Sequence, residues 1–208
     1  MTDTYVYLLD GKIYINLTNR CTNDCVFCIR SLKDDVAGAN LRLSNENVKI
    51  EDVISQLNKF DNINGNEIIF CGYGEPLIKL NLVLELSEYI KKNYSNVKIR
   101  VNTNGMANLV HKENVISKLA KNIDAISVSL NADNEKLYDE ISQPEEKYKN
   151  SYEKVKEFIK GCSDAGLETT ATIVTGYKNF KPDVEKCEQI AKSLGAKFRI
   201  REWLDNGY

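Results

Sequence analysis

The stretch that decides the fold and chemistry of this chain is Cys21-Thr22-Asn23-Asp24-Cys25-Val26-Phe27-Cys28, three residues after the strand-like residues 12–17. Three cysteines within eight residues can place three thiolates around one metal centre. A 4Fe–4S cubane has four irons and is usually held by four cysteines, so three ligands leave one iron open. An open coordination position is what catalysis needs, whereas a structural site normally closes it.

Structural zinc and a disulfide framework both explain the three cysteines less well than an open iron–sulfur site does. Structural zinc takes four ligands, but the single histidine, His111, lies far away among polar residues and no fourth cysteine stands at finger spacing. A disulfide framework belongs to secreted chains, and the first residues lack the basic segment and long apolar run of a signal peptide. Reduced cysteines and an open iron–sulfur site are therefore the favoured interpretation.

Size and composition are those of an ordinary globular domain. The chain has 208 residues, of which 42% are hydrophobic and 28% charged, enough to bury one sizeable core. The formal net charge of -2 offers no general basic surface, so nucleic acid is not favoured as a partner. No apolar stretch approaches the length of a membrane span. We expect residues 1–208 to form one soluble, cytoplasmic domain, with no further domain for a second cluster.

Strand-like apolar runs alternate with helical patterns along the chain. The runs occupy residues 13–17, 67–71, 97–102, 125–130, 168–174 and 197–201. Helical periodicity is clearest at residues 155–162, before the stop at Gly166, and recurs at residues 82–90 and 183–194. This alternation predicts parallel βα units, arranged either as a doubly wound sheet or as a barrel.

The sixth run lies a few residues from Tyr208, which leaves no room for two further βα units. We therefore expect an α/β fold of the open, partial (β/α)6 TIM-like barrel type, with outer helices and an N-terminal hairpin before the first parallel strand. An open barrel has a lateral mouth. Residues 18–49 are long for a βα loop, and long loops are usually functional, so this loop is expected to hold the cluster.

Polar segments follow one strand after another. The cysteines follow the first predicted strand, residues 72–76 the second, Thr103 and Asn104 the third, and Ser129 and Asn131 the fourth. In parallel βα folds ligands bind at the carboxyl ends of strands, so these segments are predicted to form one composite site.

Each of these segments can also serve a purely structural purpose. Glycines 72 and 74 permit close backbone approach to a ligand, yet Gly- and Pro-rich loops are commonly simple turns. Ser129 and Asn131 can hydrogen-bond a ribose or a carboxylate, but Asn131 can instead cap the following helix.

The remaining candidates are individual side chains. Cys162 and Cys187 lie on apolar helix stripes and are expected in the core. Cys71 ends a strand beside the glycine segment; a structural role is favoured, although it can face the site. Arg30 can balance cluster charge or pair with a substrate carboxylate. Arg199 and Arg201 alternate on the last strand, and one of them is expected to reach cofactor or substrate.

These motifs resemble those of the radical S-adenosylmethionine (SAM) superfamily, whose cysteine spacing also places an aromatic residue before the third cysteine. More narrowly, residues 15–23, 70–77, 102–105, 127–132 and 198–202 resemble the small radical SAM proteins associated with, or fused to, TatD-type hydrolases. The resemblance covers nearly the whole chain, and it supplies cofactors and initial chemistry but no substrate.

The resemblance implies that Cys21, Cys25 and Cys28 hold an oxygen-sensitive 4Fe–4S cluster whose open iron chelates SAM. It implies that SAM is bound by the glycine segment, Gly72, Tyr73, Gly74 and Glu75, and by the ribose-binding positions Ser129 and Asn131. Further SAM contacts are expected from positions on the strands: Thr103, Asn104, Val174 and Arg199. Val174 can also be a core residue with a ligand-facing edge. In the superfamily, one electron cleaves SAM to methionine and a 5′-deoxyadenosyl radical, which abstracts hydrogen from the substrate. The implied partners are an external one-electron reductant of flavodoxin or ferredoxin type and, through the family's associations, a TatD-like hydrolase.

Three alternatives stay open at this point. One is a radical SAM enzyme with a known small task, namely a deazapurine synthase or a glycyl-radical activase. Another is a redox or regulatory iron–sulfur binding module that does not cleave SAM, and the last is a structural metal protein. Because the open flank of a partial barrel suits a large substrate, we expect a protein or peptide rather than a free metabolite.

Overall fold

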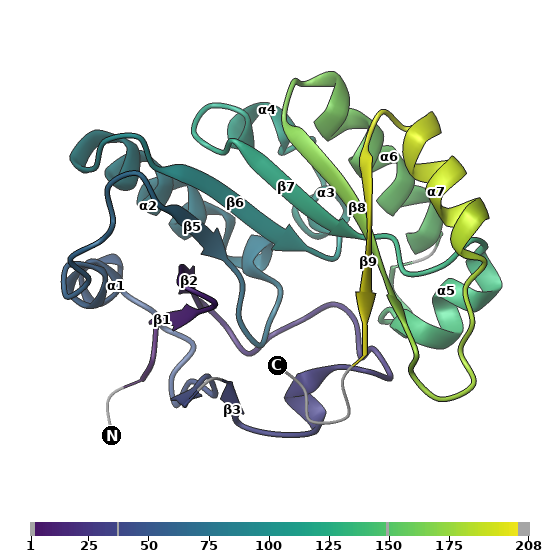
Figure 1. The fold of residues 1–208 in the computed structure, drawn as a ribbon, viewed down its shortest axis with the longest axis horizontal. Coiled ribbons are helices and arrows are strands. Elements are labelled where there is room, and N and C mark those ends of the chain that lie inside the picture. The colour runs from purple at the N-terminus through teal and green to yellow at the C-terminus, as the bar shows by residue number, and fades with distance from the viewer. Residues whose placement is uncertain (1–2, 37, 149, 204–208) are drawn as a thin grey trace.

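Seven strands form one sheet in the computed structural model, which describes residues 3–36, 38–148 and 150–203 (Figure 1). Their order across the sheet is β1 (Val6–Leu9), β2 (Lys12–Ile15), β5 (Glu67–Phe70), β6 (Lys98–Thr103), β7 (Ala125–Ser129), β8 (Glu168–Thr175) and β9 (Lys197–Glu202). β1 and β2 form an antiparallel hairpin, and every other neighbouring pair is parallel. The six predicted parallel strands are confirmed, with ends that differ by one or two residues.

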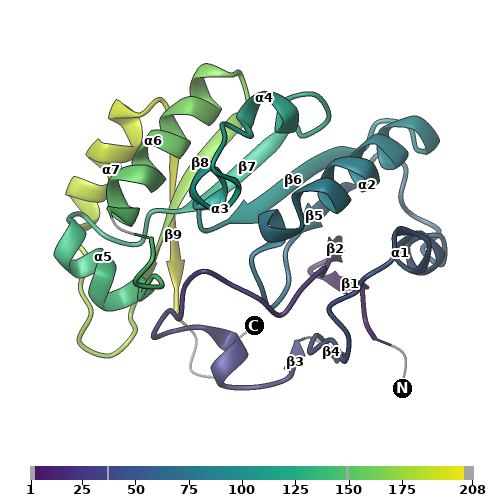
Figure 2. The same cartoon turned by 180° about the vertical axis from the view of Figure 1, so that it is seen from behind.

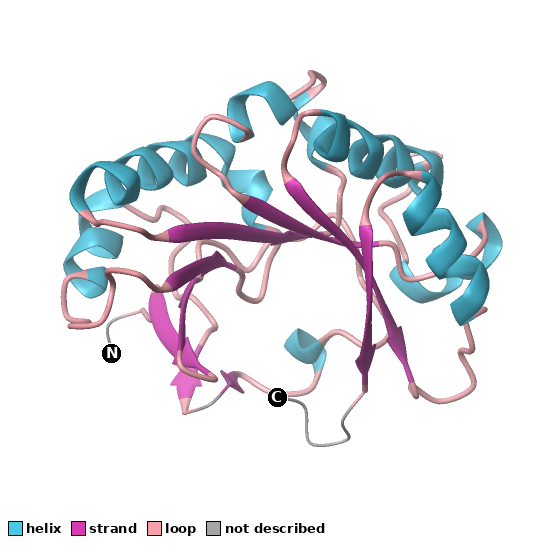
Figure 3. Ribbon diagram, turned by 45° about the horizontal axis from the view of Figure 1, so that its top comes forward, coloured by secondary structure: helices cyan, strands magenta, loops and turns pink. Residues whose placement is uncertain are grey.

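The order of the strands decides between the two predicted architectures. Each parallel strand pairs with the next one along the chain, as in a barrel, whereas a doubly wound sheet reverses direction at a switch point. The sheet curves into an arc (Figure 3), and in the described part of the chain β1 and β9 are its two unpaired ends. The open partial barrel is therefore confirmed.

Helices cover the outer, convex face of the arc (Figure 2). They are α1 (Ile50–Leu57), α2 (Leu80–Asn93), α3 (Ala107–His111), α4 (Ile116–Leu119), α5 (Glu135–Ser142), α6 (Ser151–Asp164) and α7 (Val184–Ser193). α6 buries its predicted stripe of Val155, Phe158, Ile159 and Cys162 in the core. The chain leaves α6 through Gly166 at φ +82°, a conformation that glycine adopts without strain.

The loop after β2 crosses the inner side of the arc, as Figure 1 shows. It carries a short 3-10 helix, η1 (Ile29–Ser31), and a small antiparallel pair, β3 (Asp35–Val36) with β4 (Ala39–Asn40). A second, smaller apolar cluster of Tyr7, Val36, Leu41 and Tyr73 attaches this loop to the hairpin and to the glycine segment. The predicted cysteine-bearing loop is thus packed in place by side chains from distant parts of the chain.

His111 ends α3, where its Nε2 lies 2.7 Å from the carbonyl oxygen of Leu77. One structural alternative from the sequence is excluded. Asn131 does not cap the following helix, because the cap of α5 is Asn134, whose side chain accepts from Leu137 N at 3.0 Å. No helix among the described residues is long and apolar enough to cross a bilayer.

Candidate active site

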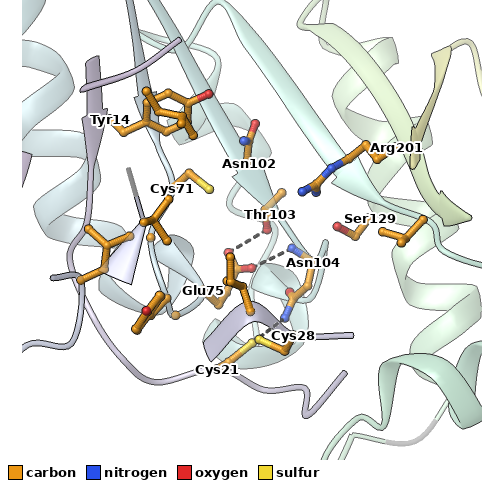
Figure 4. Close-up of a pocket in the computed structure, with 18 of the residues that line it drawn as sticks. Tyr14, Cys21, Cys28, Cys71, Glu75, Asn102, Thr103, Asn104, Ser129 and Arg201 are labelled. Carbon is orange, nitrogen blue, oxygen red and sulfur yellow. Dashed lines mark hydrogen bonds between the residues drawn. The ribbon is translucent and has the colours of Figure 1, made fainter. Parts of the chain in front are cut away.

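A cavity of about 720 Å³ lies inside the arc, at the carboxyl ends of the strands (Figure 4). Its lining includes most of the residues predicted for the site, namely Cys21, Cys28, Gly72, Tyr73, Gly74, Glu75, Thr103, Asn104, Ser129, Val174 and Arg199. Six successive strand ends are represented, so the convergence of the polar segments is confirmed. Cys25 and Asn131 are the two predicted residues that do not line the cavity.

The cysteine loop is fixed by backbone hydrogen bonds to the end of α5 and by the side chain of Arg30. Asp24 N donates to Gln143 O at 3.0 Å and Val26 N donates to Ile141 O at 2.9 Å, which ties the loop to the end of α5. Arg30 donates to the carbonyl oxygens of Asn19 (3.1 Å) and Asn23 (3.4 Å). The Arg30 guanidinium therefore joins separate parts of the loop by hydrogen bonds and places a positive charge beside the thiols.

The three thiols are half-buried, and those of Cys21 and Cys28 line the cavity. Burial, followed by the charge of Glu75, raises the pKa of Cys21 to about 11. Burial also raises the pKa of Cys25, and the neighbouring Cys21 and Cys28 raise it further. Both thiols are therefore protonated at neutral pH, and a metal centre must displace the Cys21 and Cys25 protons when it binds.

The donor set consists of three thiols on one short loop. In the described residues no group of three His, Cys, Asp or Glu side chains is placed to hold one metal ion. A cubane presents its irons at separate corners, so its thiolate ligands need not converge on one point. Three thiols on one loop, two of which line a cavity, are the arrangement expected for a cluster with an open iron.

The glycines of residues 72–76 are required by packing against the cysteine-bearing segment. A Cβ on Gly72 would lie 2.0 Å from Asn16 Oδ1, and one on Gly74 would lie 2.3 Å from Arg20 O. Gly74 N donates to Thr18 O and Glu75 N donates to Arg20 O, both at 2.8 Å. The close backbone approach predicted for a ligand is thus made first to the chain's own residues 16–20, which positions Cys21.

Glu75 is the buried centre of the site, with 4% of its surface exposed. Its carboxylate accepts from Thr103 Oγ1 at 2.7 Å, from Asn104 N at 2.7 Å and from Leu77 N at 3.0 Å. Burial raises the pKa of Glu75 to about 7, although the three hydrogen bonds oppose the rise. Glu75 therefore joins the glycine segment to the end of β6.

Asn104 carries this connection on to the cysteines. Its Nδ2 donates to Thr22 Oγ1 at 2.7 Å, and it lies 3.7 Å from Cys21 Sγ. Its Oδ1 accepts from Met106 N at 3.0 Å. A continuous network thus runs from the glycine segment through Glu75 and Asn104 to the first cysteine (Figure 4).

The far wall of the cavity comes from the last three strands. Ser129, Val174, Arg199 and Arg201 line it, and one Arg199 Nη donates to Ser127 Oγ at 3.3 Å. Asn131 lies behind this wall at φ +61°, where its Nδ2 donates to Ser142 Oγ at 3.0 Å. Ser129 is thus available to a ligand, whereas the Asn131 amide is engaged in the protein.

Sequence reasoning missed several residues of the inner floor. Tyr14, Arg100 and Asn102 line the cavity from β2 and β6, and Cys71 faces it as well. The signal was the alternation in residues 98–103, which puts polar Arg100 and Asn102 on the same face of a strand. A polar stripe on a central parallel strand is unusual and indicates a ligand-bearing barrel interior.

The comparison with known families decides what this site belongs to. A family profile described as the radical SAM superfamily matches residues 15–191. The chain belongs to the radical SAM superfamily. Membership in this superfamily implies a 4Fe–4S cluster and SAM as cofactors.

Two curated proteins are distant relatives of this radical SAM chain. It is 26% identical over 200 residues to the dual-specificity RNA methyltransferase RlmN of Buchnera aphidicola, covering 88% of this chain and 53% of the relative. It is 29% identical over 160 residues to an uncharacterized protein of Methanocaldococcus jannaschii, covering 74% of this chain and 49% of the relative. The chain thus spans about half the length of these relatives.

Solved structures share the radical SAM fold. Streptococcus suis SuiB bound to S-adenosylmethionine superposes with a TM-score of 0.66 at 19% identity, covering 92% of this chain and 40% of SuiB. anSMEcpe with bound AdoMet gives a TM-score of 0.61 at 17% identity, covering 92% of this chain and 52% of that one. At these identities the likeness shows the fold alone.

Proposed function

We propose that this radical SAM chain binds one oxygen-sensitive 4Fe–4S cluster through Cys21, Cys25 and Cys28 and cleaves SAM reductively. The observation that carries the proposal is the convergence of the cysteine loop and the polar strand ends on one cavity of about 720 Å³. Such a volume is that of a small-molecule site. When bound and reduced, the cluster and SAM supply a 5′-deoxyadenosyl radical for hydrogen abstraction.

The chain's own residues would position SAM and shield the reaction. Carbonyl groups of residues 72–75 would accept from the SAM ammonium group, and Ser129 would hydrogen-bond the ribose. Val174 would pack on the adenine, and Arg199 would attract the carboxylate. Glu75 and Asn104 are engaged with the protein, so they would hold the glycine segment, Thr103 and Cys21 in register. The structures of SuiB and anSMEcpe with SAM bound support the use of this fold for SAM.

The substrate that we propose is a protein or peptide. β1 and β9 are unpaired edges in the described part of the sheet, so one flank of the arc is not closed by strands. The net charge of -2 favours protein over nucleic acid. The RlmN match is too distant and too short to carry an RNA substrate over to this chain.

The proposed partners follow from the chemistry and from the sequence resemblance. The cluster needs an external one-electron donor, for which a flavodoxin or ferredoxin is suited. The resemblance to TatD-associated proteins makes a TatD-like hydrolase the proposed functional partner. The cytoplasm is the proposed location, because it keeps the thiols reduced.

The competing functions differ in what they do with SAM. A deazapurine synthase-like or glycyl-radical activase-like enzyme would also cleave SAM but would act on a defined small molecule or a glycyl-radical enzyme. A non-catalytic iron–sulfur module would bind the cluster without cleavage. Gly74 and Glu75 fit closely into the network that joins the proposed SAM site to the cysteine loop. This fit favours an enzyme over a non-catalytic module.

Anaerobic reconstitution tests the proposal. The wild-type chain should bind about four irons and four sulfides and should form 5′-deoxyadenosine from SAM when dithionite is added. A triple variant, Cys21→Ala, Cys25→Ala and Cys28→Ala, should do neither. Cys162→Ala and Cys187→Ala are matched controls because both side chains are buried in helices. A triple variant with full cluster content would refute the ligand assignment, and a loaded wild-type chain that leaves SAM intact would favour the non-catalytic module.

A further inference from the structure

Cys71 is the one cysteine outside residues 21–28 that reaches the cavity in the described part of the chain. The other two, Cys162 and Cys187, are fully buried in α6 and α7. Cys71 directly follows β5, where its N–H donates to Ile15 O at 2.9 Å and its carbonyl accepts from Tyr7 Oη at 3.1 Å. These bonds fix the backbone, so the thiol is held facing the cavity.

An unpartnered oxygen lies on the neighbouring strand. Cys71 continues from Phe70, which pairs with Val101 of β6, so Asn102 is its neighbour across the sheet. Asn102 Oδ1 is buried and has no hydrogen-bond partner. Arg100 Nε also has no hydrogen-bond partner, but it forms an ion pair with Glu67 Oε1 at 3.2 Å. A buried acceptor without a donor costs about 1–3 kcal/mol, and a ligand that brings an N–H or O–H to Asn102 would offset that cost.

Cys71 and Asn102 therefore share a position where a ligand is expected. Figure 4 shows the Cys71 sulfur and the Arg201 guanidinium directed toward the same central space, with Tyr14 beside Cys71. The glycine segment begins at the next residue, Gly72, so this position adjoins the proposed SAM site. Asn102 precedes Thr103 along β6, so this position lies one residue farther from the carboxyl end of that strand than the predicted SAM contact Thr103.

The thiol keeps its proton here. Burial raises the pKa of Cys71 above its ordinary value of 9.0, although a hydrogen bond from Asn102 opposes the rise. At neutral pH the side chain is thus an S–H group rather than a thiolate nucleophile. An S–H bond is weaker than an aliphatic C–H bond, so a thiol gives up a hydrogen atom readily to a carbon radical.

We propose that Cys71 is a catalytic residue that donates a hydrogen atom to a substrate carbon radical held beside Asn102. This inference rests on the proposed function, which generates that radical. In the step, the S–H bond breaks and a C–H bond forms, which leaves a thiyl radical on Cys71. One electron from the external reductant and one proton from solvent then restore the thiol. The substrate is an organic molecule, or a side chain of a peptide, with an N–H or O–H near the reacting carbon.

The origin of the transferred hydrogen provides the test. The full chain, reconstituted anaerobically in D2O, is given SAM and dithionite without substrate, so that the accepting carbon is the 5′ carbon of the 5′-deoxyadenosyl radical. Mass spectrometry then measures the deuterium fraction per molecule of 5′-deoxyadenosine, a ratio that does not depend on rate. Wild type and Cys187→Ala should incorporate deuterium, and Cys71→Ser and Cys71→Ala should show a several-fold lower fraction.

Tyr14 supplies the decisive control, because its phenol also exchanges with solvent and lines the cavity. Tyr14→Phe should leave the deuterium fraction unchanged. An equal fraction in wild type and Cys71→Ser, or a loss confined to Tyr14→Phe, would overturn the proposal. A wild-type chain that forms no 5′-deoxyadenosine at all would instead refute the proposed function, so the two failures are distinguishable.

A second measurement does not depend on turnover. Cluster-free wild-type protein is treated with iodoacetamide at alkaline pH, because the reagent reacts with the thiolate and burial raises the pKa of Cys71, Cys162 and Cys187 alike. The labelled peptides are quantified by mass spectrometry. Cys71 should be alkylated in the folded protein, whereas Cys162 and Cys187 should react only after urea is added. Folded protein in which Cys71 is as unreactive as Cys162 would show that its thiol does not face an open cavity, and the proposal would fall.

Discussion

Replacing Glu75 by glutamine should change how the stability of the protein depends on pH. Glu75 is buried, and burial moves its pKa from the ordinary 4.5 to about 7. Between these values the folded protein holds a proton that the unfolded chain has released. The free energy of unfolding therefore falls as pH rises through this range. The stabilising contribution is present at low pH and is lost above about pH 7.

The magnitude follows from the pKa difference. One pKa unit corresponds to about 1.4 kcal/mol, so the full change is about 3 kcal/mol. Part of the unfolded-state titration lies below pH 5, which leaves about 2 to 3 kcal/mol between pH 5 and pH 8. Glutamine does not titrate, so the variant should lack this slope. The glutamine amide NH2 would also face Asn104 N, which is a donor as well. This unsatisfied contact costs about 1–3 kcal/mol at every pH.

Urea unfolding of the cluster-free protein, followed by circular dichroism at pH 5 and pH 8 without oxygen, measures the effect. From pH 5 to pH 8 the free energy of unfolding of wild type should fall by about 2 to 3 kcal/mol more than that of Glu75→Gln. Glu168→Gln is the matched control, because Lys197 and Lys98 hold the pKa of Glu168 near 2, outside this window. Parallel pH profiles for wild type and Glu75→Gln would refute the reasoning, since they would mean that the three hydrogen bonds keep Glu75 ionised throughout.

Three further predictions test the site. Gly74→Ala should displace the cysteine loop, because its Cβ meets Arg20 O at 2.3 Å; overpacking of this kind costs about 1–3 kcal/mol and should lower the iron content after reconstitution. Gly161→Ala, which meets only the flexible end of Ile116, is its control, and equal iron in both variants would contradict the packing argument. Ser129→Ala should weaken SAM binding about fivefold, the value of one lost hydrogen bond of about 1 kcal/mol, as measured by equilibrium dialysis; unchanged affinity would move the ribose site elsewhere. Asn131→Ala should lower the free energy of unfolding by about 1–2 kcal/mol. The variant loses the hydrogen bond to Ser142, and alanine is disfavoured at a φ of +61°. Full stability combined with lost SAM affinity would instead place Asn131 in the cofactor site.

Much of this protein could be predicted from its sequence because the relevant signals are local. The spacing of Cys21, Cys25 and Cys28 fixes three thiols on one short loop, whatever the rest of the chain does. Strand and helix periods give the βα order, and parallel strands must present their carboxyl ends at one edge. These facts alone bring the cysteines, Gly74, Thr103 and Ser129 to the same side of the sheet.

Only the tertiary structure decided which of these side chains face a ligand and which hold the protein together. The sequence of loop residues 72–74 does not say which segment they will contact. The pairing of β2 with β5 brings Gly74 against Arg20. The curvature of the sheet turns Asn102 and Cys71 inward, and the left-handed backbone of Asn131 turns its amide toward Ser142. Such outcomes depend on contacts between segments tens of residues apart, where register and curvature set distances to a fraction of an ångström. A sequence period specifies the face of an element, but it does not specify which atoms of another element that face will meet.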